Sequence, residues 1–179
     1  MLAEYIGVAQ LNDLISRQAE LVEKVSLSEL QRLLQLLVPL DSVDEPEVSV
    51  CLKFRCPEGA GVPPVLAVKI DGELGLECQR CLRPMVWSPG VDTELVLQMP
   101  GRSPDESYDQ VDHIEVTEQG LELRELIEDE LVSAIPFSPR HSEQCEVVSL
   151  TVEEEAEDES THKPFTGLAD LLKDGQSEN

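Results

Sequence analysis

The pair Cys78 and Cys81, separated by two residues, is the feature that most constrains how this chain can fold. A Cys-x-x-Cys loop lets two thiolates reach one metal ion without backbone strain, and tetrahedral zinc then needs two further ligands. The downstream candidates are His141 and Cys145, a His-x-x-x-Cys pair after a proline-containing segment where the chain must turn. If all four side chains bind one structural zinc ion, two segments far apart in the sequence must meet.

Two other interpretations of the cysteine pair stay open. A thioredoxin-type redox dithiol belongs at a helix N-terminus in a βαβ unit, whereas Cys78 follows strand-like sequence. The cysteines could also be unligated and partly buried. Cys51 and Cys56 are predicted to be incidental thiols, because a reducing compartment disfavours disulfides. His113 and His162 have no neighbouring residue that suggests catalysis.

Three arginines, Arg80, Arg83 and Arg140, flank the predicted ligands. Three thiolates and a neutral imidazole around Zn²⁺ leave one net negative charge, which these arginines could offset. They would also form a small basic face on an acidic molecule. That face is a candidate contact for an RNA phosphate or for an acidic patch of a partner.

The formal net charge of −24 argues against general nucleic-acid binding, which draws on clustered Lys and Arg. The same charge favours basic protein partners, although it could serve solubility alone. No apolar run reaches the roughly 18 residues of a membrane span, and Glu4 stands where a signal peptide would be basic. We therefore expect a cytoplasmic protein without a membrane partner.

Hydrophobic periodicity predicts an α+β fold. Apolar residues recur every three or four positions over 27–38, after a capping box at Ser26, which predicts an amphipathic helix. A second main helix is predicted over 123–135, with its many carboxylates on a solvated face. A weaker helical pattern lies within 1–18, and Gly72 indicates a bulge or a bend within the strand-like run 65–78. Strand-like segments favour an antiparallel sheet or a small barrel, and they cover 19–25, 48–55, 65–71, 72–78, 91–97 and 113–116.

We expect a single α+β domain over residues 1–150 that carries the Cys/His site. Residues 151–179 are predicted to be a flexible acidic tail, because 153–159 hold six acids in seven positions and cannot bury apolar surface. A short amphipathic segment near the C-terminus could dock on the domain or on a partner. It contains Phe165, Leu168, Leu171 and Leu172.

The chain resembles the YceD family, the large ribosomal RNA subunit accumulation proteins, in a series of ordered segments over about residues 10–173. The most specific are the cysteine segment 76–82 and the acidic helix 126–131. The other matching segments are 28–33, 114–116 with Gly120, Pro136 with 139–141, and 163–173.

The resemblance implies a role in processing or accumulation of the large-subunit ribosomal RNA. Many members carry a Cys-x-x-x-Cys after the acidic helix, and His141 and Cys145 fall on those positions, which favours the shared zinc site. Other members continue with a further Cys-x-x-Cys. This chain has Glu146 and the acidic tail there, so a second metal site is not expected.

We therefore expect a non-enzymatic ribosome biogenesis factor that binds a basic ribosomal protein or an rRNA-processing factor, and no small-molecule substrate. The sequence has no phosphate-binding glycine loop, nucleophile elbow or His-Glu-x-x-His motif. The alternative is a redox or metal-sensing regulator that switches through Cys78 and Cys81. A nuclease is a third option, for which the sequence offers no site.

Overall fold

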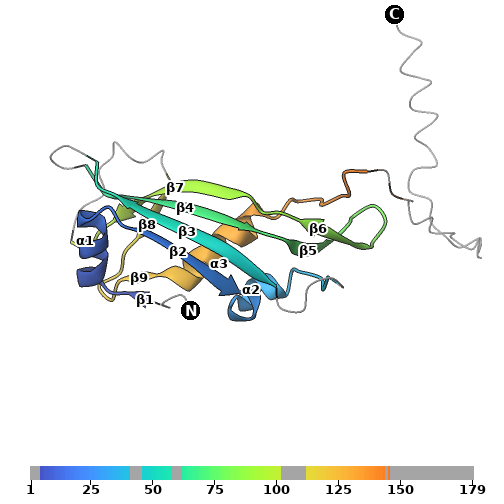
Figure 1. Ribbon diagram of the computed structural model, residues 1–179, viewed down its shortest axis with the longest axis horizontal. Helices are drawn as coiled ribbons and strands as arrows, with labels where there is room; N and C mark the ends of the chain where they lie inside the picture. The colour runs from blue at the N-terminus through green and yellow to red at the C-terminus, as the bar shows by residue number, and fades with distance from the viewer. Residues whose placement is uncertain (1–4, 41–45, 58–61, 102–111, 144, 146–179) are drawn as a thin grey trace, which may run out of the picture. The chain divides into compact units, whose positions relative to one another are not determined.

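Five strands form the main sheet of the protein, in the order β2-β3-β4-β7-β8 (Figure 1). The computed structural model describes residues 5–40, 46–57, 62–101, 112–143 and 145. Neighbouring strands pair antiparallel except β8, which joins β7 in parallel. Their bounds are β2 Glu20–Ser26, β3 Glu47–Arg55, β4 Val65–Gly72, β7 Val91–Gln98 and β8 His113–Glu115. The α+β fold is thus confirmed, as a mixed sheet. Over the described residues β2 and β8 remain edge strands, so the sheet does not close into the alternative small barrel.

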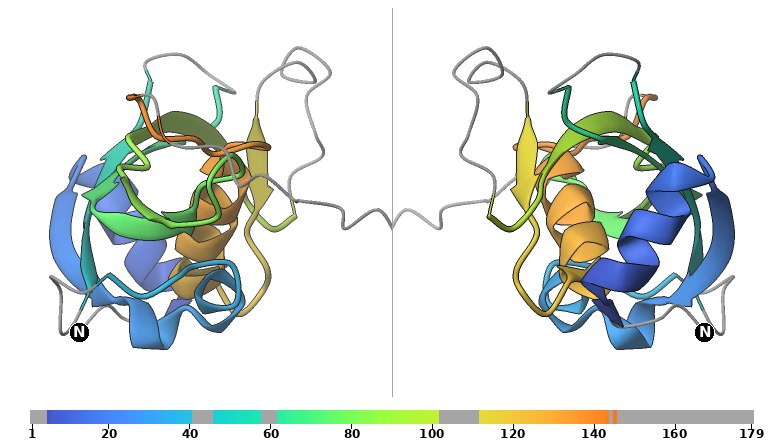
Figure 2. Two further views of the ribbon diagram at one scale, coloured as in Figure 1. Left: turned by 90° about the vertical axis from the view of Figure 1, so that its right-hand side faces the viewer. Right: turned by 90° about the vertical axis from the view of Figure 1, so that its left-hand side faces the viewer.

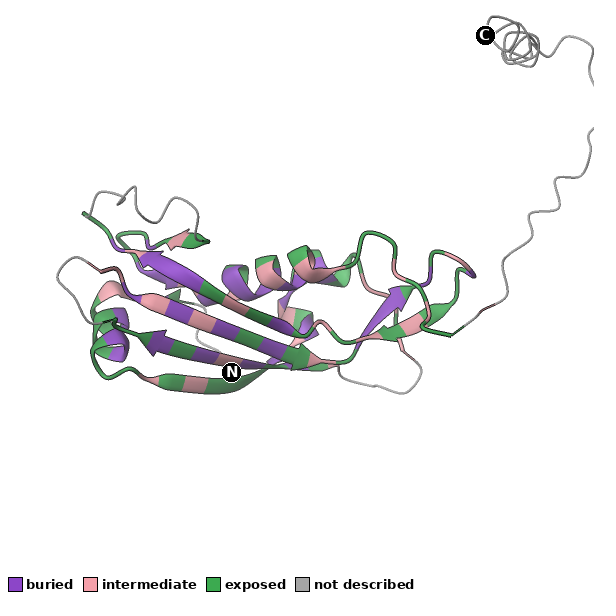
Figure 3. Ribbon diagram, turned by 90° about the horizontal axis from the view of Figure 1, so that it is seen from above, coloured by how far each residue is buried: buried purple, intermediate pink, exposed green. Residues whose placement is uncertain are grey.

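Period-two alternation places one face of each central strand in the core, as Figure 3 shows along the ribbon. In β3, Val48, Val50, Leu52 and Phe54 are buried, because successive strand side chains point to opposite faces. The opposite face carries cross-strand ion pairs. They are Lys24–Glu47, Lys53–Glu20, Arg55–Glu94 and Lys69–Asp92. This outer face is therefore solvated and electrostatically balanced.

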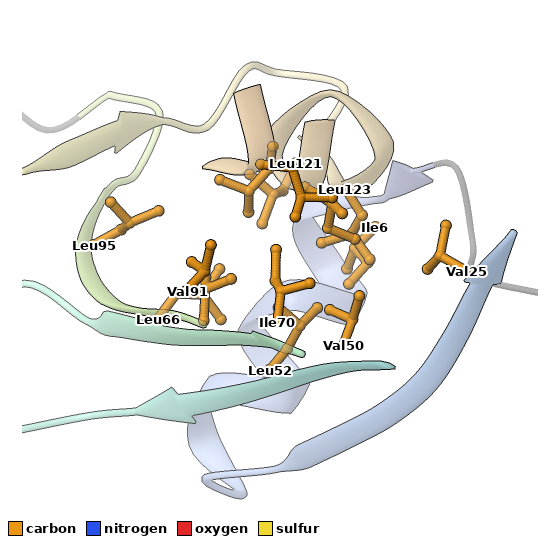
Figure 4. Packing of buried hydrophobic residues seen from close by; sticks show 14 of the residues in the cluster. Ile6, Val25, Val50, Leu52, Leu66, Ile70, Val91, Leu95, Leu121 and Leu123 are labelled. Atoms are coloured by element: carbon orange, nitrogen blue, oxygen red, sulfur yellow. The ribbon is translucent and has the colours of Figure 1, made fainter. Parts of the chain in front are cut away.

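Helices pack on the inner face of the sheet, which curves around them (Figure 2). The helix α3, Leu123–Ala134, buries Leu126, Ile127 and Leu131, and the helix α1, Val8–Ser16, buries Leu11. Figure 4 shows residues of the strands meeting residues of β1, β9 and α3 in one apolar core. Ile6, Leu52, Leu66, Ile70, Leu121 and Leu123 in this core are all at most 1% exposed. The core is thus built mainly from aliphatic side chains of the sheets and helices.

The helix predicted over 27–38 is shorter than expected. It is divided into a 3₁₀ turn, Leu27–Glu29, and a four-residue helix, α2 Gln31–Leu34. Ser26 caps the turn by accepting from the amide of Ser28 at 3.4 Å, without the predicted capping box. Leu30, between the two pieces, has a φ of −106° and a ψ of 77°, outside helical values, so the helix cannot be continuous.

Glu128 of α3 is the tertiary contact that fixes the start of α2. Its carboxylate accepts from the backbone amides of Arg32 (2.6 Å) and Leu33 (3.0 Å), and it pairs with the Arg32 guanidinium at 2.8 Å. The prediction that the α3 carboxylates are solvated is wrong for Glu128, which is only 7% exposed. Burial alone would raise the pKa of Glu128, but Arg32 and the two amides together lower it.

Two small sheets complete the described fold. β1, Tyr5–Ile6, pairs with β9, Leu121–Glu122, and β5, Leu74–Glu77, pairs with β6, Pro84–Trp87. Of the bulge or bend predicted at Gly72, the structure shows a break between strands, since Gly72 pairs in regular register with Val48, β4 ends there and β5 belongs to another sheet. The strand β6 was not predicted, because four residues beginning with a proline give almost no alternation to detect.

The β5–β6 hairpin is held against the segment that follows α2. The amide of Val38 donates to the carbonyl of Gly75 at 2.9 Å. A Cβ on Gly75 would lie 2.0 Å from the Val38 carbonyl oxygen, so only glycine permits this approach. The contact positions the hairpin that carries Cys78 and Cys81.

The predicted domain boundary at residue 150, the acidic tail over 151–179 and its amphipathic segment lie outside the described residues. Residues 1–147 form one compact unit, to which all described residues belong. Within those residues, no helix combines the length and the apolar character needed to cross a membrane.

Replacing Glu128 tests the link between α3 and α2. We expect E128Q to lower the free energy of unfolding by about 2 kcal/mol, because a buried charge-assisted network loses its charge. The exposed D129N should leave stability nearly unchanged, although Asp129 also pairs with Arg32 at 2.7 Å. Chemical denaturation of both variants measures the difference.

The difference in stability between wild type and E128Q should also depend on pH. Because the folded-state pKa of Glu128 lies below its ordinary value of 4.5, the carboxylate stabilises the fold above that value. This contribution is lost as the pH falls through the folded-state pKa. The stability gap between wild type and E128Q should therefore narrow below pH 4.5, and a constant gap would contradict the assignment.

Candidate metal centre

The loop after β5 presents Cys78 and Cys81 on a tight backbone turn. The amide of Cys78 donates to the carbonyl of Arg83 at 3.0 Å, and the amide of Leu82 donates to the carbonyl of Cys78 at 2.8 Å. Leu82 has a φ of 55°, in the left-handed region that side chains rarely adopt. These bonds fold the loop back on itself, so that both thiols point to one side.

The segment after α3 brings the other two side chains to this loop. The helix ends at Ala134, before Pro136, and the extended chain crosses the loop, where the amide of Gln79 donates to the carbonyl of Pro139 at 2.8 Å. His141 and Cys145 follow. The four side chains Cys78, Cys81, His141 and Cys145 offer ligand atoms that all lie within 4.8 Å of one another. The structure therefore brings together the four residues that the spacing singled out.

Two distances inside this cluster match the edges of a tetrahedral site. The sulfur atoms of Cys78 and Cys145 are 3.8 Å apart, and the sulfur of Cys81 is 3.5 Å from Nδ1 of His141. Zn–S bonds of about 2.3 Å and Zn–N bonds of about 2.0 Å give tetrahedral edges of about 3.8 Å and 3.5 Å. Three soft sulfur donors and one imidazole are a donor set typical of structural zinc. The cluster could therefore bind a metal ion, and it fits zinc.

Burial and backbone amides set the ionisation of the cluster. Burial would raise the pKa of Cys78, but the amides of Cys81, His141 and Arg80 donate to its sulfur and lower the pKa to about 5. Burial and the neighbouring sulfurs of Cys81 and Cys78 raise the pKa of Cys145. Thiolates this close repel one another, so a divalent metal among them would stabilise the fully deprotonated set.

The three predicted arginines lie on the segments that carry the ligands. Arg80 is half-buried inside the cysteine loop, while Arg83, at the start of the hairpin's return strand, and Arg140, directly before His141, are exposed. Arg80 supports the site through its backbone amide. All three therefore belong to the immediate surroundings of the cluster.

Sequence reasoning missed the exposed apolar side chains on the same two segments, the cysteine hairpin and the chain after α3. Leu82 and Val86 are 54% and 53% exposed, and Phe137 is fully exposed. Phe137 sits between Pro136 and Pro139, so the sequence signal was an aromatic residue in a segment that can neither continue the helix nor form a strand. We define the arginine face as Arg80, Arg83 and Arg140 together with Leu82, Val86 and Phe137.

The other sequence candidates lie away from the cluster. Cys51 stands on the outer face of β3, where its thiol donates to Glu20 at 3.3 Å, and Cys56 is exposed at the end of that strand. His113 is exposed on β8, and His162 lies outside the described residues. Cys51 and Cys56 thus serve as internal controls for the cluster.

Metal analysis of the purified protein tests the cluster directly. We expect one zinc ion per chain, and a chelator should lower the midpoint of thermal unfolding by about 10 °C, because structural zinc contributes folding free energy. C78S and C145S should lose both metal and stability.

The matched controls C51S and C56S should keep the metal and the wild-type midpoint. An equal midpoint with and without chelator would contradict a structural metal. Metal loss in the controls would show that the ligands had been assigned wrongly.

Comparison with known proteins gives one family. No solved structure matches the chain. A family model described as "Large ribosomal RNA subunit accumulation protein YceD" matches residues 66–172, which is more than half of the chain. The match includes the whole Cys/His cluster and α3, while the resemblance predicted for residues 10–65 lies outside it. The chain belongs to the YceD family of large ribosomal RNA subunit accumulation proteins.

Proposed function

We propose that the protein is a non-enzymatic, cytoplasmic factor in large-subunit biogenesis, needed for processing or accumulation of the large ribosomal RNA. Its membership of the YceD family carries the proposal, because the family description names accumulation of the large ribosomal RNA subunit. The proposed metal is zinc, held by Cys78, Cys81, His141 and Cys145. Four protein ligands make a closed site with no position for a substrate, which is typical of structural zinc.

The proposed partner is a basic ribosomal protein or an rRNA-processing factor. A net charge of −24 attracts basic proteins and repels the phosphate backbone over most of the surface. Complementary charge also speeds encounter with a basic partner. Contact with rRNA is therefore proposed only where cations and apolar side chains are concentrated.

The arginine face is the proposed site for such a local contact. Guanidinium groups bind phosphate oxygens, and an exposed aromatic ring such as Phe137 offers a surface on which an unpaired base can stack. Zinc would act indirectly there, because it would hold the segments of Cys81 and His141 in place.

Complementation of a deletion strain tests the proposed function. The double variant F137A/R140A should fold with wild-type stability but fail to restore large-subunit rRNA accumulation, because two exposed side chains are removed from the contact. V22A/K24A, on the exposed edge strand β2, is the control and should restore it. Ribosome profiles and rRNA levels report both results. A deletion strain with normal large-subunit rRNA would contradict the function itself.

A redox or metal-sensing regulator is the second candidate, favoured by the lowered pKa of Cys78, about 5. A reactive thiol must also be accessible, whereas Cys78 is 0% exposed and Cys81 is 4% exposed. This burial favours a structural role.

Thiol titration separates the two candidates. With bound zinc, we expect Cys56 to react rapidly and the cluster cysteines to stay blocked until a chelator is added, because ligated thiolates are shielded. Rapid modification of Cys78 in the metal-loaded protein would favour the sensor. Mass spectrometry of the labelled peptides identifies the modified residue.

A further inference from the structure

A cavity of about 320 Å³ lies beside α3, away from the residues of the metal cluster. It opens between α3, the edge strand β8 and the β1–β9 pair, and Figure 2 shows β8 (yellow) running beside α3 (orange). Leu95, Ile114, Leu121 and Leu126 give it apolar walls. The cavity is thus large enough for a long side chain with an aliphatic stem.

The rest of the lining is acidic, and part of that acidity is uncompensated. Asp129 pairs with Arg32, and Glu122 accepts from the hydroxyl of Tyr5. Three further lining carboxylates, Glu115, Glu125 and Glu130, have no hydrogen bond or ion pair with any residue in the described part of the chain. Burial, with Asp112 and Asp129 nearby, raises the pKa of Glu130. A cation in the cavity would relieve the repulsion between these carboxylates.

The edge strand β8, which lines the same cavity, carries backbone groups that pair with no other described strand. The amide of Val96 donates to the carbonyl of Asp112, and the amide of Val116 donates to the carbonyl of Gln98. In a parallel ladder these alternating bonds use the backbone of residues 112, 114 and 116. The amides and carbonyls of His113 and Glu115 therefore face away from β7, and no other described strand pairs with them.

We propose that this cavity and the free edge of β8 bind an extended, lysine- or arginine-containing segment of a basic protein. The segment adds a strand to β8 through the backbone of His113 and Glu115, and one cationic side chain enters the cavity. Its aliphatic stem packs on the apolar walls, and its charge meets Glu125 and Glu130. Charge complementarity selects this occupant, because the same carboxylates repel a nucleic-acid phosphate. The inference rests on the proposed function, since it locates the binding site of the basic partner.

The probe is a fluorescein-labelled nine-residue peptide of alternating lysine and threonine, titrated into the full-length, zinc-loaded protein at physiological salt. Two double variants remove the same charge, E125Q/E130Q in the lining of the cavity and D71N/E73Q at the exposed end of β4. A second peptide carries N-methyl groups on alternate residues, so that it keeps its charge but cannot pair with a strand edge.

We expect E125Q/E130Q to weaken binding by about tenfold and D71N/E73Q by less than about twofold, since two close charge contacts are lost only in the first. The N-methylated peptide should also bind about tenfold more weakly. Amide NMR signals of residues 113–115 should shift on addition of the unmodified peptide. Equal weakening by both variants, equal binding of both peptides, or unshifted signals at 113–115 would each overturn the proposal.

The peptide-binding test and the test of the proposed function can fail independently of each other. Peptide binding uses only purified components, whereas rRNA levels in the deletion strain test the role in ribosome biogenesis. If E125Q/E130Q lost peptide binding but fully restored rRNA accumulation, this site would be overturned as the partner's site while the function would stand.

Discussion

The packing of α3 on the inner face of the curved sheet is the contact on which the rest of the described structure depends. One side of this helix packs in the core through the buried residues Leu126, Ile127 and Leu131. Its buried Glu128 then reaches the amides of α2, and its exit at Pro136 delivers the chain to the cysteine loop. Removing the helix would therefore remove the cap of α2 and half of the cluster as well as core volume.

The cluster compensates for a part of the fold that has little core of its own. A two-stranded hairpin such as β5–β6 is marginally stable in water, and only a few residues of it are buried. Aromatic residues make up only 3% of the chain, so large side chains are scarce for anchoring such an extension. Four ligands on one ion would provide an equivalent anchor with short side chains, at the point where Gln79 already binds Pro139.

The sequence predicted the elements with a sustained period and the four residues of the Cys/His cluster, which occur as two pairs with short, strict spacing. Val48 to Phe54 alternate over a full strand, and Cys78 with Cys81 can meet one ion in almost any fold, so both predictions depend on local geometry alone. The errors arose where a distant contact decides the outcome. Leu30 breaks the helical pattern of 27–38 because Glu128, far along the chain, caps α2 from outside. The free edge of β8 was equally hidden, since a three-residue parallel strand leaves no pattern that distinguishes edge from centre.

This arrangement gives the protein two surfaces of opposite charge, the arginine face and the acidic cavity. Their positions at different parts of α3 bear on how an acidic protein can act near RNA. The arginine face follows the C-terminal exit of the helix, while the acidic cavity is lined by residues 120–130 before that exit. A chain of net charge −24 gains little from long-range attraction to RNA, so the proposed rRNA contact would be short-ranged and would rely on the arginine face. The acidic cavity would repel RNA, and the same carboxylates that repel phosphate would attract a basic protein segment. On the proposed function, the basic partner would supply most of the affinity for a maturing ribosomal particle, and the arginine face would help to orient the protein on it. Binding to the particle should then depend more on the exposed basic segments of its proteins than on its RNA sequence.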